Sequence, residues 1–230
     1  GKTTLLHLIA DSVQEKQKLP LEGGKIRVVP KARLGLLEQN LSMLAPEKTV
    51  LENVMEQSIF KEDLARTILA RLLLSEKDLN KKVQMLSGGE RIKLAFARLF
   101  VDNVNVLVLD EPTNYLDIAS MEALEQMFSV YEGTLVFVSH DEAFIRAVAT
   151  EILIVEDGKI RAFRGTPEEY FSSHSAIIVM YCVYVRSILS KYGLYRLTIS
   201  FAHAYKGKHS WLSSFSTFSL SLIFPLFFGL

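Results

Sequence analysis

Cysteine is almost missing from this sequence, whose 230 residues contain only Cys182. A single thiol excludes an intrachain disulfide framework and a cysteine metal cluster. The chain also lacks a net charge, because 26 Lys and Arg residues balance 26 Asp and Glu residues. This balance does not indicate a uniformly basic nucleic-acid-binding domain. The apolar content of 49% is typical of a folded domain.

Acidic residues are missing from the C-terminal part of the chain. Glu169 is the last of them, whereas residues 175–230 hold five basic residues and are rich in Ser, Phe, Tyr and Leu. We therefore divide the chain into an α/β domain at residues 1–172 and an apolar, basic tail at residues 173–230. The tail has no capped helices and no steady apolar period, so we expect it to be disordered or non-native.

The end of the tail has no charge over the 19 residues from Leu212 to Leu230. Such a run is long enough to be a transmembrane candidate, although its serines and Pro225 weaken that interpretation. Three interpretations of the tail stay open: non-native coding sequence, a membrane-associating segment, or an unusual native extension. The first is favoured, so we expect no membrane contact.

The start of the chain is Gly1-Lys2-Thr3-Thr4, with neither an initiator Met nor a signal peptide. This start indicates a chain truncated within a longer protein.

Helices and strands alternate in the apolar pattern of residues 1–172. The predicted helices are residues 3–15, 88–101, 120–131 and 142–149, with a further helical region at 49–86 that opens on a capping box. The predicted strands are residues 25–29, 34–37, 104–109, 134–138 and 152–155. The last three runs are almost wholly apolar, which is typical of strands buried on both faces of a parallel sheet. The pattern predicts an α/β fold.

The first candidate site is the start of the chain, where Gly1-Lys2-Thr3-Thr4 precedes an apolar helix. A helix N-terminus presents free N–H groups and the positive end of its dipole to a phosphate. Lys2 would add a positive charge there, and the Thr3 hydroxyl could ligate Mg²⁺. Four residues are weak evidence on their own, so this site depends on the rest of the sequence.

A stronger motif is the apolar run Val106–Leu109, which ends in Asp110 and Glu111. Ligands of α/β sheets bind at the carboxyl ends of the strands, where these two carboxylates would lie. Asp110 would hold Mg²⁺, directly or through water, and Glu111 would polarise an attacking water as general base.

Two further motifs flank this strand in the sequence. Leu86-Ser87-Gly88-Gly89-Glu90 opens a predicted helix, and its backbone N–H groups with the Ser87 hydroxyl could form an anion site. Ser139-His140-Asp141 follows the next buried strand. A histidine at that strand end could reach a γ-phosphate.

Taken in this order, the motifs resemble those of the ABC ATPase family over residues 1 to about 172. The resemblance implies a P-loop NTPase fold with a helical subdomain at about residues 49–101, and ATP and Mg²⁺ as its ligands. It identifies Gly1–Thr4 as the end of Walker A, Gln39 as the Q-loop glutamine, Leu86–Glu90 as the signature, Val106–Glu111 as Walker B, Asn114–Asp117 as the D-loop and His140 as the switch histidine.

Residue roles follow from the same resemblance. The expected catalytic residues are Glu111 and His140, and the expected Mg²⁺ ligands are Thr3, Gln39 and Asp110. The residues expected to bind ATP, in this cassette or in its partner, are Gly1, Lys2, Thr3, Thr4, Gln39, Asp110, Ser87, Gly88, Gly89 and Glu90.

The family arrangement also implies a partner. ATP would lie between Walker A of one cassette and the signature of a second cassette, in a head-to-tail pair. One cassette alone is therefore expected to hydrolyse ATP poorly, and this chain is expected to bind ATP weakly.

The sequences of several motifs are similar to those of the ABC-F subfamily, above all Asp110–Asp117, Glu38–Asn40 and Ser87–Arg91. The segment Ala65–Leu74 is most similar to the second cassette of bacterial antibiotic-resistance members. The resemblance implies a cytoplasmic protein with two cassettes that acts on the ribosome, in translation or in ribosomal protection, mainly through a linker that is not part of this sequence. The alternatives are the ATPase subunit of a membrane transporter and a non-functional gene remnant.

Overall fold

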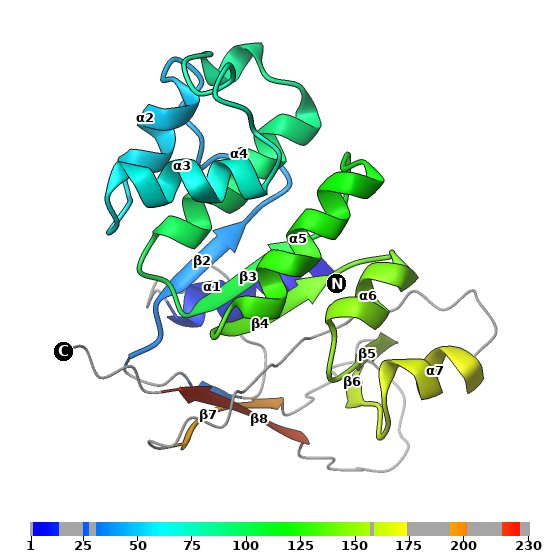
Figure 1. Ribbon diagram of the computed structural model, residues 1–230. Coiled ribbons are helices and arrows are strands. Elements are labelled where there is room, and N and C mark those ends of the chain that lie inside the picture. The colour runs from blue at the N-terminus through cyan, green and yellow to red at the C-terminus, as the bar shows by residue number, and fades with distance from the viewer. Residues whose placement is uncertain are drawn as a thin grey trace, which may run out of the picture.

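The computed structural model describes residues 2–13, 25–27, 31–156, 159–173, 194–201 and 218–225. Gly1 and Cys182 lie outside the described residues, as does the side chain of Lys2. Figure 1 shows a sheet with helices on its faces, a helical part above it, and a second small sheet below it.

A three-stranded parallel sheet forms the centre of the molecule. It contains β2 (Leu34–Leu37), β3 (Val106–Asp110) and β4 (Thr134–Val138), in the order β2-β3-β4. Every residue of β3 and β4 is buried. The prediction of parallel strands buried on both faces is thus confirmed for these two runs, and their apolar composition follows from that burial.

Helices cover both faces of this sheet. Helix α1 (Lys2–Val13) packs against β2, β3 and β4 from one side, and α5 (Ile118–Val130) lies on the other side, where it packs against α6 (Glu142–Val148) (Figure 1). The side chains of Asp117 and Asp141 cap α5 and α6, because they accept hydrogen bonds from the amides of Ser120 and Phe144. These caps fix the points where the chain leaves the strand ends and turns into a helix.

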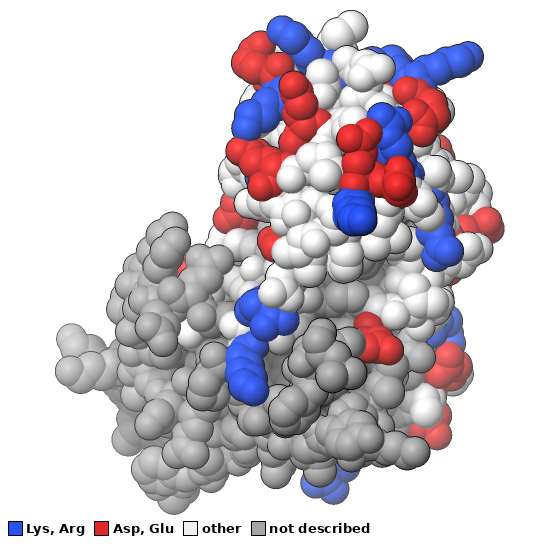
Figure 2. Space-filling view, turned by 60° about the vertical axis from the view of Figure 1, so that its left-hand side comes forward, with Lys and Arg blue, Asp and Glu red and all other residues white. Residues whose placement is uncertain are grey.

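The helical part contains α2 (Val50–Met55), α3 (Glu62–Arg71), the 3₁₀ turn η1 (Val83–Met85) and α4 (Gly88–Val101). The predicted capping box is confirmed: the Thr49 amide donates to Glu52 Oε2 at 2.7 Å, and the Glu52 amide donates to Thr49 Oγ1 at 3.2 Å. Figure 2 shows basic and acidic side chains interspersed over this part. On this face, charges of the two signs mix rather than forming a basic surface.

The strand expected at residues 152–155 is present, but the prediction that it belongs to the parallel sheet is wrong. In the described residues β5 (Leu153–Glu156) pairs antiparallel with β6 (Lys159–Ala162), and not with the parallel sheet. The missed signal is Asp157-Gly158, a dipeptide that favours a two-residue hairpin between neighbouring strands. Helix α7 (Pro167–Ser173), also not predicted, packs against α6.

A third sheet of the described residues involves the C-terminal region. Strand β7 (Leu194–Phe201) pairs antiparallel with β1 (Lys25–Arg27) on one side and with β8 (Phe218–Pro225) on the other. Strands β7 and β8 lie in the tail that is expected to be disordered or non-native. The domain boundary at residue 172 stays a prediction. Among the described residues, no helix combines the length and apolarity that crossing a membrane requires.

The burial of β3 predicts the effect of a cavity in the sheet. Leu107 has no exposed surface, so we expect Leu107→Ala to lower the free energy of unfolding by about 2–5 kcal/mol. Urea unfolding followed by circular dichroism measures this loss. The matched control is Val130→Ala, because Val130 is 64% exposed and its truncation leaves no cavity. Equal urea midpoints for the two variants would contradict the placement of β3 in the core.

Candidate functional site

Thr3 and Asp110 meet where the first turn of α1 passes the carboxyl end of β3. Thr3 Oγ1 donates a hydrogen bond of 2.9 Å to Asp110 Oδ2, although 107 residues separate the two in sequence. Asp110 is nearly buried, with 7% of its surface exposed, whereas Thr3 is exposed. The contact therefore joins a hydroxyl and a carboxylate, two oxygen donors of the kind that Mg²⁺ prefers.

Glu111 and His140 form a second pair beside the first. His140 Nε2 lies 3.2 Å from Glu111 Oε1, and the His140 amide donates to Glu111 Oε2 at 3.3 Å. The pairing of β3 with β4 places Asp110 opposite Val138, so the residues that follow the two strands emerge together. The carboxylate that was predicted as general base thus contacts the predicted switch histidine.

The backbone after β3 turns sharply, which determines where the Glu111 carboxylate lies. Glu111 has a φ of 51°, a left-handed conformation that costs energy for a residue with a side chain. The Glu111 amide compensates in part by donating to the Val138 carbonyl at 2.9 Å. The buried Ser139 hydroxyl lies 3.4 Å from the Thr113 hydroxyl, so a polar contact ties the two strand ends together.

Two cavities adjoin these pairs. The smaller, of about 260 Å³, is lined by Thr3, His7, Gln39 and Asp110 among others. The larger, of about 720 Å³, is also lined by Gln39 and Asp110, and it extends to Glu111 and Gly88. Gln39 and Asp110 therefore line both cavities, and the assignment of Gln39 as the Q-loop glutamine stays a prediction.

These side chains fit a Mg²⁺ ion by their chemistry. Thr3 Oγ1 and Asp110 Oδ2 are already 2.9 Å apart, and Gln39 lines the same cavity. Mg²⁺ is usually bound in proteins by one or two such oxygens, with phosphate oxygens and water completing its ligands. The assignment of Thr3, Gln39 and Asp110 as its ligands stays a prediction.

The predicted signature lies at the start of α4. Ser87 is the N-cap: its Oγ accepts a hydrogen bond from the Glu90 amide at 3.3 Å, and the Glu90 carboxylate accepts one from the Ser87 amide at 2.7 Å. The backbone hydrogen bond from Ser87 is the main cause of a lowered pKa for Glu90. Glu90 thus contacts the first turn of its own helix, which leaves the Gly88 and Gly89 amides as the donors for an anion.

The structure brings together only part of the predicted site. Of the signature residues, Gly88 lines the larger cavity, whereas none lines the smaller cavity that contains Thr3. Thr4 is exposed in α1 and lines neither cavity. Within this chain the start of α1 and the signature therefore contribute to different cavities.

One contact was missed from the sequence. The carbonyl oxygen of Tyr115 lies so close to Gly89 that a Cβ added at Gly89 would be 2.7 Å from it. Tyr115 itself has a φ of 66° and an 82% exposed side chain. Gly89 is therefore needed for close packing of the Tyr115 loop on α4, and the Gly-Gly pair was the only sign of this in the sequence.

Comparison with known proteins shows which family this sequence resembles. Residues 1–114 match the family model described as ABC transporter. "Probable ATP-binding protein YbiT" of Escherichia coli O157:H7 is 36% identical over 75% of this chain and 32% of its own length. "ATP-binding protein Uup" of Escherichia coli K12 is 38% identical over 74% of this chain and 28% of its own length. "ABC transporter F family member 5" of Arabidopsis thaliana is 38% identical over 76% of this chain and 25% of its own length.

A solved structure, the MJ0796 cassette dimer bound to ADP and Pi, is 27% identical over 58% of this chain and 64% of that chain, with a TM-score of 0.48. The family assignment rests on the sequence matches: this chain carries an ABC transporter-like ATPase domain, an α/β P-loop NTPase cassette. The chain spans about a third or less of the length of these curated relatives.

The contact at Gly89 leads to a paired prediction. We expect Gly89→Ala to lower the melting temperature, because its Cβ would meet the Tyr115 carbonyl oxygen at 2.7 Å. Gly88→Ala is the control, since its Cβ would meet Tyr115 only at 3.9 Å, an ordinary contact. Differential scanning calorimetry measures the melting temperatures of both variants. If both melt at the same temperature, the Tyr115 loop does not pack on α4 as described.

Proposed function

We propose that this domain binds Mg·ATP and hydrolyses it to ADP and phosphate. The observation that carries the proposal is the pairing at two neighbouring strand ends: Thr3 with Asp110 at 2.9 Å, and Glu111 with His140 at 3.2 Å. A hydroxyl and a carboxylate for the ion, next to a second carboxylate and an imidazole, are the groups that phosphoryl transfer to water requires.

Each side chain has a role in this proposal. Lys2, Thr3 and Asp110 hold the phosphates and the ion, with the backbone of Gly1 and Thr4 adding N–H groups at the start of α1. The ion, when bound, neutralises charge that develops on the phosphate oxygens. Glu111 accepts a proton from the attacking water, and Gln39 and His140 contact the γ-phosphate.

The proposed partner is a second cassette, in the same longer chain or in a dimer. Support comes from two exposed side chains next to the signature: Met85, which precedes it and is 70% exposed, and Tyr115, which packs on Gly89 and is 82% exposed. Large exposed side chains of this kind are typical of an interaction surface. A partner that covers them would bring its own start of α1 to the Ser87–Gly89 turn.

We further propose that the full-length protein is a cytoplasmic ABC-F protein that acts on the ribosome, as a translation factor or in antibiotic protection. The proposal is supported by the sequence of the D-loop motif, Asn114-Tyr115-Leu116-Asp117, and by relatives named as F family members. Ribosome contact would come from other regions of that protein, since acidic and basic side chains mix on the helical part (Figure 2). The second candidate is a transporter ATPase, with the family match as its support.

The role of Glu111 can be tested by Glu111→Gln in the full-length protein. Glutamine cannot accept the proton of the attacking water, so we expect turnover to fall by about 100-fold or more, with ATP affinity retained. Phosphate release and equilibrium nucleotide binding measure the two effects. The control is Glu122→Gln, a carboxylate on α5 outside both cavities. Undiminished hydrolysis by Glu111→Gln would show that Glu111 is not the base.

The ribosomal role can be tested with the same variant. A hydrolysis-deficient Glu111→Gln protein should stay in its ATP-bound form, so we expect it to co-sediment with ribosomes in a sucrose gradient only when ATP is present. Lys2→Ala is the control, because the loss of the phosphate-binding charge should abolish this co-sedimentation. Recovery with the membrane fraction instead of ribosomes would favour the transporter.

A further inference from the structure

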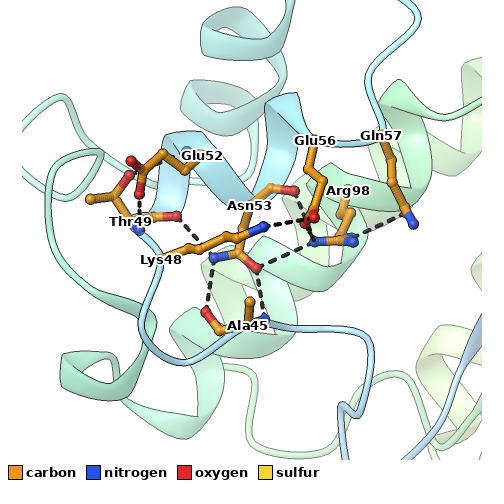
Figure 3. Close-up of polar contacts among 8 residues, drawn as sticks. All are labelled: Ala45, Lys48, Thr49, Glu52, Asn53, Glu56, Gln57 and Arg98. Carbon is orange, nitrogen blue, oxygen red and sulfur yellow. Dashed lines mark hydrogen bonds and ion pairs between the residues drawn. The ribbon is translucent and has the colours of Figure 1, made fainter.

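A buried amide connects the helical part to the loop that follows Gln39. Asn53, in α2, has no exposed surface, and all four hydrogen-bonding positions of its side chain are used (Figure 3). Its Nδ2 donates to the carbonyls of Ala45 and Thr49 at 3.1 and 3.0 Å. Its Oδ1 accepts from the Ala45 amide at 2.8 Å and from Arg98 Nη1 at 3.3 Å. Asn53 therefore holds both polar backbone groups of Ala45.

Arg98 holds Asn53 from the other side. This residue of α4 is 5% exposed, so its charge depends on hydrogen-bond partners in place of water. Its Nη1 donates to the Asn53 carbonyl at 3.0 Å and to Glu56 Oε2 at 3.3 Å, and its Nε donates to Gln57 Oε1 at 3.1 Å. Figure 3 shows these side chains converging on one guanidinium. The loop residue Ala45 is thus linked to α4 through one side chain.

Hydrogen bonds within the segment between Gln39 and Ala45 order it, so that fixing Ala45 also restricts where Gln39 lies. The Leu41 amide donates to the Glu38 carbonyl and the Leu44 amide to the Leu41 carbonyl, each at 3.0 Å. The Ser42 hydroxyl also donates to Glu38 Oε2 at 2.7 Å. Two consecutive turns therefore lie between Gln39 and the point that Asn53 holds.

We infer that Asn53 and Arg98 are positioning residues, which fix the loop that follows Gln39 to α4, the helix that Ser87 caps. This inference rests on the proposed function, because it concerns where Gln39 lies relative to Asp110 and to the signature. Gln39 lines both cavities beside Asp110, and Arg98 lies on the same helix as Ser87, Gly88 and Gly89. The two elements that would contact the γ-phosphate of two different ATP molecules are thereby held as one unit.

A purely structural role, in which the cluster only joins α2 to α4, makes a different prediction. That junction depends on the Asn53 backbone carbonyl, Glu56 and Gln57, all of which contact Arg98 without the Asn53 amide group. The amide group of Asn53 is directed mainly to Ala45, through two hydrogen bonds. Removing it therefore tests the loop while leaving most of the junction between the helices in place.

The experiment is amide hydrogen exchange on the full chain, comparing Asn53→Ala with wild type and with Gln57→Ala. We expect exchange at residues 39–45 to rise about tenfold or more in Asn53→Ala, because the Ala45 amide loses its acceptor, with no change in α3. Gln57→Ala is the matched control, since Gln57 contacts the same guanidinium but no loop residue. Unchanged exchange in the loop of Asn53→Ala, or an equal rise in the loop and in α3, would overturn the inference.

A second measurement separates positioning from folding. In the full-length protein we expect Asn53→Ala to lower kcat for ATP hydrolysis about tenfold, while nucleotide affinity changes about threefold at most. Arg98→Lys, which keeps the charge but not the forked donors, should give an intermediate kcat. Wild-type kcat in a folded Asn53→Ala protein would show that the cluster is only structural. Failure of the wild-type protein to bind Mg·ATP would instead overturn the proposed function, while the exchange result still reports on the loop.

Discussion

The parallel pairing of β3 with β4 is the constraint on which the rest of the site depends. Its register places Asp110 opposite Val138, so the two chain segments that leave the sheet carry Glu111 and His140 side by side. A parallel sheet can be covered by helices on both faces, which explains why these strands contain almost no polar residue before their last positions. The polar groups of the candidate site lie at the carboxyl edge of the sheet, and α1 adds Thr3 at that edge.

The helical part is connected to this edge in two ways. The backbone of the loop after Gln39 pairs with the segment before the signature, since the Gln84 amide donates to the Pro46 carbonyl at 3.1 Å. The Asn53 and Arg98 side chains add a second link, buried from water, between the same loop and α4. Buried polar groups of this kind are costly when unpaired, so each link favours a single relative placement of loop and helix. Glu90, by capping α4, fixes the turn at which that helix begins.

Much of the fold was predictable because local rules sufficed. The strand at 134–138, the helix at 88–101 and the capping box at Thr49 depend on apolar period or on contacts three residues apart. The strand predicted at 104–109 is also present, although β3 spans Val106–Asp110. The prediction was wrong for β5, which pairs with β6 and not with the parallel sheet, because an apolar run does not record which strand it pairs with. Helix α7 was missed because it is short, and β1 was predicted as a strand without any indication that it pairs with β7.

The sequence by itself indicated Asp110, Glu111, Ser87 and His140 as candidate site residues, because each follows a buried strand or opens a helix, and both features show in the local pattern. It did not determine distances between them. Only the tertiary structure decided that Thr3 reaches Asp110 across 107 residues and that Asn53 links Ala45 to Arg98. The physical reason is that these contacts join segments brought together by the packing of helices on a sheet, and no periodicity within one segment records its neighbour.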